Sequence, residues 1–190
     1  MTRHIPKFRP ALLGLAAMLI GSTVTSQAAD LIWHWQGTVP TGTIKTEIEQ
    51  SMYGARMNFN NHSNHTYGGD FAVNYNSGVP TAQVAGWKGL LSFGGSRNTR
   101  VAQHEISHWL VVGTYQPSWN NNRSGNTWTG AHGTAQVKAF DGSAAVLYSD
   151  GVHMWPYGLN YDNEWTTASQ SRNVYMVGAT RWDVGLSHYP

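Results

Sequence analysis

The residues best suited to chemistry in this 190-residue chain are two histidines and a glutamate within the segment HEISH. His104 and His108 are four positions apart, so on a helix both imidazoles project from one face toward one metal ion. Zinc accepts neutral imidazole and tolerates an open coordination position. Glu105, one step round the helix, can take a proton from a water molecule at that position. The spacing predicts a hydrolytic zinc centre; the alternative is two solvated histidines on an ordinary helix.

Composition favours the metal centre over this alternative. The chain has 9 His and 4 Glu, so chance places HExxH somewhere in it on the order of 1% of the time. It has no cysteine, which excludes disulfides and restricts any metal site to histidine and carboxylate ligands.

A third ligand has to come from elsewhere, and His153 is the best candidate. It follows the second histidine of HEISH by 45 residues, in an aromatic-rich turn bounded by Gly and Pro. The alternative is a loop histidine packed on Trp155. Asp150 and Glu164 are reserve ligands because carboxylates also bind zinc, and His132 is a weaker rival.

Tyr157 lies four residues beyond His153, in the same turn. A phenol close to the metal can donate a hydrogen bond to a tetrahedral oxyanion, which makes Tyr157 a candidate catalytic residue. The alternative is an ordinary packing tyrosine.

Hydrophobic periodicity predicts the elements that position these residues. HEISH lies on a helix from about residue 98 to residue 112, and Gly113 stops it. A strand, GLLSF, precedes this helix at residues 89–93. Further strands are expected at 31–36 and 71–75, and further helices over about 44–59, 134–140 and within 166–182, whereas 114–131 and 150–164 read as loops. This order predicts an α+β domain with a loop-rich C-terminal half.

HEISH and the preceding GLLSF resemble the core of the zincin metallopeptidases. The resemblance covers about residues 30–113, most specifically 87–113. It implies a small twisted sheet with an edge strand that binds substrate, and a central helix that supplies two zinc ligands and the catalytic glutamate. Carried over to this sequence, it makes His104 and His108 ligands and Glu105 the general base. It also makes residues 89–93 the edge strand, so that the residues expected to bind an extended peptide by strand addition are Leu90, Leu91, Ser92 and Phe93.

The chain departs from one branch of that superfamily. The metzincin motif has a glycine three residues after the second histidine and a third histidine three residues further on. Val111 and Thr114 stand at these positions here. Membership of that branch is therefore not expected, and the third ligand must lie further downstream.

The first 28 residues have the layout of a secretory signal peptide. Three basic residues precede an apolar run over 11–20, and Ser26 and Ala28 fit the −3 and −1 positions of a cleavage site. The run is about half the ~20 residues needed to span a bilayer, which disfavours the alternative of a membrane anchor. We therefore expect a signal peptide at 1–28 and one domain at 29–190.

Removal of the signal peptide changes the charge. The full chain carries +2, and residues 1–28 hold three of its 12 Lys and Arg and none of its 10 Asp and Glu, so the mature chain carries 9 − 10 = −1. This balance gives no electrostatic case for a nucleic-acid or membrane partner.

Together these features predict a secreted or periplasmic endopeptidase, monomeric, with one catalytic Zn²⁺ and a peptide or protein as substrate. Two alternatives stay open. One is a non-catalytic glycan-binding module that uses its many tryptophans. The other is a zinc hydrolase that acts on a non-protein amide or an ester.

Overall fold

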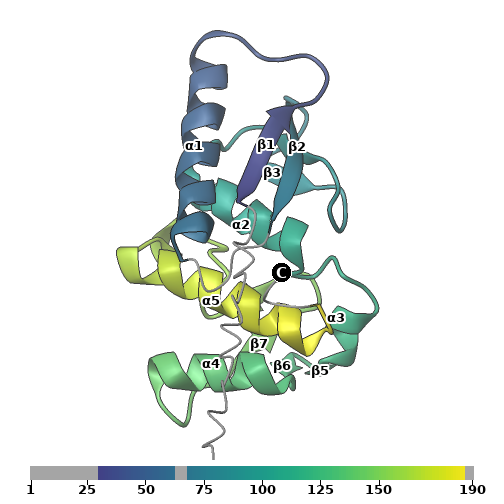
Figure 1. Ribbon diagram of the computed structural model, residues 1–190, viewed down its shortest axis with the longest axis vertical. Helices are drawn as coiled ribbons and strands as arrows, with labels where there is room; N and C mark the ends of the chain where they lie inside the picture. Colours follow the sequence, from purple (N-terminus) through teal and green to yellow (C-terminus); the bar gives the residue numbers. More distant parts are fainter. Residues whose placement is uncertain (1–29, 63–67, 187–190) are drawn as a thin grey trace, which may run out of the picture.

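The protein has a mixed α+β fold, as the sequence predicts (Figure 1). The structure, a computed structural model, describes residues 30–62 and 68–186. The expected signal peptide at 1–28 lies outside these residues. Within the described ranges, no helix is long and apolar enough to cross a membrane.

The main sheet contains β1 (Leu31–Trp35), β2 (Gly69–Tyr75), β3 (Ala82–Val84) and β4 (Leu91–Phe93) in the order β1-β2-β4-β3. The strands β1, β2 and β4 are parallel, and β3 is antiparallel to β4. The prediction that the strand at 89–93 forms an edge is therefore wrong. A hairpin folds β3 back against β4, so β4 is an interior strand with all three residues buried, and β3 is the edge.

Two helices pack with this sheet. Helix α1 (Gly42–Asn61) buries the apolar face that the sequence predicts, with Ile48, Met52, Ala55 and Phe59 in the core. Helix α2 (Thr99–Leu110) carries HEISH and is capped by Asn98, whose side chain accepts a hydrogen bond from the N–H of Val101. Figure 1 shows α2 between the α1-and-sheet half of the molecule and the C-terminal half.

The C-terminal half is more regular than predicted. The expected loops contain α3 (Ser118–Asn121), β5 (Arg123–Ser124), β6 (Thr127–Trp128), β8 (Met154–Trp155) and the 3-10 helix η2 (Asp162–Glu164). With β7 (Tyr148–Ser149) the short strands form a second, antiparallel sheet, β5-β6-β7-β8. The predicted helices are present as α4 (Ala131–Asp141) and α5 (Thr167–Asp183). The second sheet positions the turn between β7 and β8, which carries His153.

Candidate metal centre

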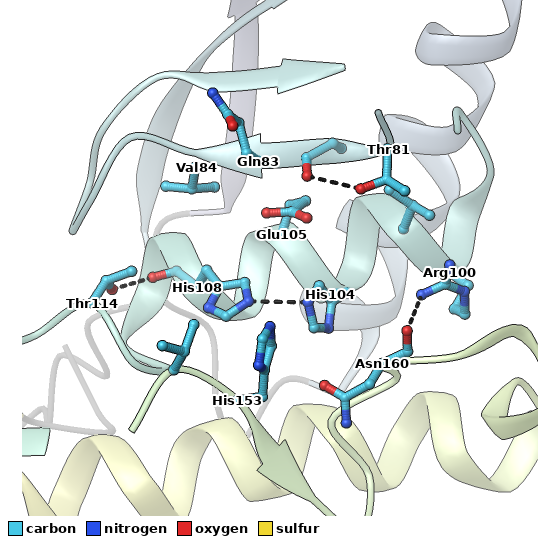
Figure 2. Close-up of a pocket in the computed structure, with 13 residues that line it drawn as sticks. Thr81, Gln83, Val84, Arg100, His104, Glu105, His108, Thr114, His153 and Asn160 are labelled. Atoms are coloured by element: carbon cyan, nitrogen blue, oxygen red, sulfur yellow. Dashed lines mark hydrogen bonds between the residues drawn. The ribbon is translucent and has the colours of Figure 1, made fainter. Parts of the chain in front are cut away.

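Three histidines from two separate parts of the chain meet beside α2. His104 and His108 project from α2, and His153 reaches them from the turn between β7 and β8 (Figure 2). The potential ligand atoms of the three side chains all lie within 4.8 Å of one another. The fold thus brings together the three residues that the sequence singles out as ligands.

The two helix histidines are oriented by backbone carbonyl groups. Nδ1 of His104 is 2.8 Å from the carbonyl oxygen of Gly158, and Nδ1 of His108 is 2.7 Å from that of Val112. A carbonyl oxygen only accepts, so each Nδ1 carries the proton and each Nε2 presents a lone pair. The two Nε2 atoms are 3.0 Å apart. Facing lone pairs at this distance repel each other unless a cation lies against both, so this arrangement could hold a metal ion.

His153 is oriented by a carboxylate. Its Nδ1 lies 3.2 Å from Oδ2 of Asp150, while Oδ1 of Asp150 accepts the backbone N–H groups of Val152 and His153 at 2.8 and 2.7 Å. Burial works to raise the pKa of Asp150, but these hydrogen bonds outweigh it and lower the pKa to about 2. Asp150, predicted as a reserve ligand, instead acts as the ionised partner that turns Nε2 of His153 toward the other two imidazoles.

The helix histidines are neutral at physiological pH. Burial, with a contribution from the neighbouring His108, lowers the pKa of His104 to about 3. Burial also lowers the pKa of His108 to about 4. A metal ligand must present its deprotonated nitrogen, so these two side chains are ready to bind without losing a proton first.

Glu105 lines the same cavity as the three imidazoles and is almost completely buried, with 5% of its surface exposed. Burial raises its pKa to about 7, and the positive charge of Arg100 acts in the opposite direction. Figure 2 shows its carboxylate between α2 and β3. A carboxyl group with a pKa near neutrality can both take up and release a proton at physiological pH.

A cavity of about 360 Å³ opens over these residues. Its walls are residues 81–84 of the β3 segment, the face of α2 that carries His104 and His108, and residues of the 152–160 segment opposite (Figure 2). Leu90, Leu91, Ser92 and Phe93 are not among the residues that line it. The backbone of β4 is paired with β2 on one side and with β3 on the other, which leaves no edge for strand addition there.

Tyr157 is not brought to the cavity. Its hydroxyl donates to Oδ1 of Asp141 at 2.6 Å and accepts a hydrogen bond from Arg172, and burial together with the Asp141 bond raises its pKa. Its backbone φ of 69° lies in the left-handed region. This placement gives no support to the predicted role in oxyanion stabilisation.

The remaining sequence candidates also lie outside the cluster. Glu164 accepts the backbone N–H of Asn160 at 2.9 Å. The ring of His132 stacks on that of Trp182, with 3.8 Å between their centroids. Neither belongs to the group of side chains that meet at His104.

A buried polar network supports the anchor of His104, and sequence reasoning missed it. Gln103 and Asn173 are both fully buried. Nε2 of Gln103 donates to Oδ1 of Asn173 at 2.9 Å, and Nδ2 of Asn173 donates to the carbonyl oxygen of Tyr157 at 2.8 Å. The next carbonyl, that of Gly158, is the acceptor for His104. No signal in the sequence marks this network, because Gln103 stands among other polar residues on α2.

Two glycines permit the close contacts on which this geometry depends. A Cβ atom at Gly158 would lie 1.9 Å from the carbonyl oxygen of Met154. At Gly113, where φ is +66°, a Cβ would lie 2.0 Å from the carbonyl oxygen of Val152. The second contact joins the end of α2 to the turn that carries His153, so Gly113 does more than stop the helix.

Comparisons with protein-family models, with curated proteins and with solved structures found no match for this chain. Its function therefore has to be inferred from the side chains of the cavity and their chemistry.

Proposed function

We propose that this protein is an exported zinc-dependent endopeptidase of the zincin type. The observation that carries the proposal is the meeting of three imidazoles, each held through Nδ1, beside a buried glutamate in an open cavity. Three imidazole nitrogen ligands with space for a fourth suit catalytic zinc better than calcium or magnesium, which prefer oxygen. When bound, zinc acts as a Lewis acid that lowers the pKa of a water molecule and polarises a carbonyl group.

Glu105 is the group that moves protons in this proposal. It accepts a proton from water as the water oxygen forms a bond to the carbonyl carbon of the substrate. It then passes that proton to the amine nitrogen as the carbon–nitrogen bond breaks. Its burial beside the histidines, and a pKa raised to about 7, suit both steps.

The substrate is proposed to lie along β3 rather than along β4. The N–H of Gly94 donates to the carbonyl of Thr81, and the N–H of Ala85 donates to the carbonyl of Leu90. Because backbone groups alternate in direction along a strand, those of Gln83 point toward β4 and those of Ala82 and Val84 point outward. The carbonyl of Val84 accepts from Gly86, and that of Ala82 accepts from the Thr81 hydroxyl at 3.3 Å. Among the described residues this leaves the N–H groups of Ala82 and Val84, and the second lone pair of the Ala82 carbonyl, for an extended peptide. Strand addition to such an edge is a common mode of peptide recognition.

The distribution of tryptophan does not favour a glycan-binding module. Trp109, Trp119 and Trp128 are buried, and Trp33 and Trp35 pack against the core. Flat stacking of sugar rings would need exposed indole faces grouped on one surface. Of the described tryptophans only Trp87 and Trp182 are exposed, at 39% and 49%.

The experiment that tests the proposal is the substitution Glu105→Gln, which keeps the size of the side chain but removes the base. Expected results are full zinc binding and a loss of hydrolysis of an unfolded, fluorescently labelled protein by at least about 100-fold. Glu49→Gln is the matched control, because Glu49 lies on α1 beside Lys45, at 3.1 Å from its Nζ, and does not line the cavity. Full activity of the Glu105→Gln protein, or no hydrolysis by the zinc-loaded wild type, would refute the proposal.

A further inference from the structure

Arg100 lies in the cavity wall one turn before His104 on α2 (Figure 2). Only 12% of its side chain is exposed. Three of its five N–H groups are used: Nε donates to Asp162 at 2.6 Å, and Nη1 donates to the carbonyl oxygens of Leu159 and Asn160 at 2.7 and 3.2 Å. Among the described residues, none accepts a hydrogen bond from Nη2. The guanidinium is thus held in place with two donors left over.

The cavity is polar at one end and apolar at the other. Arg100, Asn160 and Thr81 lie at the end near the start of α2, while Val84 and Thr114 lie at the opposite end (Figure 2). The hydroxyl of Thr114 is already bound to the carbonyl oxygen of His108, and Val152 lies against Gly113 at the same end. Val152 is 54% exposed although it is apolar. The hairpin after β3 reaches the end of α2, where Trp87 donates to the carbonyl of Leu110 at 3.4 Å, so β3 and α2 run in the same direction along the cavity.

The direction of β3 along the cavity determines which part of an added peptide meets Arg100. Antiparallel pairing is the more stable form of strand addition, so an added peptide runs from the Val84 end toward the Thr81 end. Its residues before the cleaved bond then lie toward Val84 and Val152. Its residues after the cleaved bond lie toward Arg100.

We propose that Arg100 forms an acidic-residue subsite on the C-terminal side of the cleaved bond. The enzyme then prefers peptides with an aspartate or glutamate within two residues after that bond, whose carboxylate accepts from Nη2. A charged donor and a charged acceptor form the stronger class of hydrogen bond, and arginine is well suited to carboxylates. This inference rests on the proposed peptidase function and adds its substrate class.

Two neighbouring groups bear on the charge balance of this subsite. Asp162 already pairs with the guanidinium, but its side chain is 79% exposed, so water screens much of its charge. Oδ1 of Asn160 is buried without a hydrogen-bond partner. This buried oxygen favours a substrate side chain that donates an N–H group, as glutamine does and glutamate does not. A peptide with glutamine is therefore the critical comparison for a peptide with glutamate.

The test uses quenched fluorescent peptides derived from a sequence that the zinc-loaded enzyme cleaves, with Glu, Gln or Met placed at the two positions after the bond. For the wild type, kcat/KM is expected to be about 10-fold higher with Glu than with Gln. Arg100→Gln is expected to abolish this ratio. Asp162→Asn removes the competing carboxylate and keeps the guanidinium, so it is expected to increase the ratio.

The matched control is Arg97→Gln. Arg97 makes the same kinds of contact, with Glu47 through Nε at 2.6 Å and with the carbonyl of Gly94 through Nη1, but it does not line the cavity. Its substitution should leave the Glu-to-Gln ratio unchanged.

The outcomes separate the inference from the function on which it rests. Equal cleavage of the Glu and Gln peptides, or a preference for Gln, overturns the subsite while the peptidase stands. The subsite is also overturned if Arg100→Gln and Asp162→Asn shift the Glu-to-Gln ratio of kcat/KM in the same direction. That result is expected if the Arg100–Asp162 pair is purely structural, because either substitution then breaks the same pair. If the Arg100→Gln protein does not fold, the Asp162→Asn result decides. Failure to cleave any peptide overturns both proposals.

Discussion

Replacing Asp150 with asparagine tests how His153, the proposed third zinc ligand, is held. Oδ1 of Asp150 accepts two backbone N–H groups, and an asparagine oxygen at the same place can keep both bonds. Oδ2, which lies 3.2 Å from Nδ1 of His153, becomes an NH₂ group that donates and cannot accept. The turn is therefore preserved while the orienting bond to His153 is lost.

The structure also sets the size of the effect. Loss of a group that orients a metal ligand costs about 10–100-fold in metal affinity. The 3.2 Å contact is long and the Asp150 side chain is 46% exposed, so we expect the lower end, about 10-fold, or about 1.4 kcal/mol of binding free energy. Asp150→Ala, which also removes the two backbone bonds, should cost more.

The assay is competition for zinc with a chromophoric chelator at neutral pH, together with the unfolding temperature of each metal-free variant. Asp70→Asn is the matched control, because Asp70 makes a similar bond to His34 at 2.7 Å on an exposed part of the sheet. Wild-type zinc affinity in Asp150→Asn would refute the assigned role of this carboxylate. A loss of affinity of equal size in Asp70→Asn would refute it as well.

Two further predictions concern the support of the site. Gly113→Ala should destabilise the protein by at least about 1 kcal/mol and weaken zinc binding, because the added Cβ would meet the carbonyl of Val152 at 2.0 Å. Thermal unfolding measures the stability, and the same zinc competition measures the affinity. Unchanged zinc affinity would contradict the coupling between Gly113 and the turn that carries His153. In the metal-free protein, the pKa values of His104 and His108 are about 3 and about 4, whereas a histidine in the unfolded chain has a pKa of 6.5. As pH falls, the unfolded chain therefore takes up protons before the folded protein does. Stability should therefore decrease from about pH 6.5 toward pH 4, by up to about 1.4 kcal/mol per pH unit for each histidine. Denaturant unfolding with a chelator present checks this, and a His104→Gln/His108→Gln protein with the same pH dependence as the wild type would contradict it.

Local pattern predicted much of the N-terminal half. The apolar face of α1 and the presence of α2 follow from residue spacing within a few turns of chain, although α2 ends at Leu110, two residues earlier than expected. The edge strand β3 did not follow from pattern. It has only three residues, and its position at the edge is defined by pairing with β4, which the residues of β3 themselves do not encode.

The site divides in the same way. HEISH predicts two neighbouring ligands because a helix places residues four apart on one face. His153 could be chosen as the third because it lies in an aromatic-rich turn bounded by Gly and Pro. The direction of Tyr157 was not predictable from its spacing, since its φ of 69° turns the side chain toward Asp141. The roles of Asn173 and Arg100 depend on contacts with the 157–162 segment, which begins 47 positions after the end of α2 (157 − 110), and they appear only in the folded molecule.

The most direct test of the account is the position of zinc in crystals of the zinc-loaded protein, located by anomalous scattering at the zinc absorption edge. The account predicts one site per chain, about 2.0–2.1 Å from Nε2 of His104, His108 and His153, with Glu105 beside it but not bound to it. A zinc ion held by other residues, or one that lacks His153 as a ligand, would contradict it.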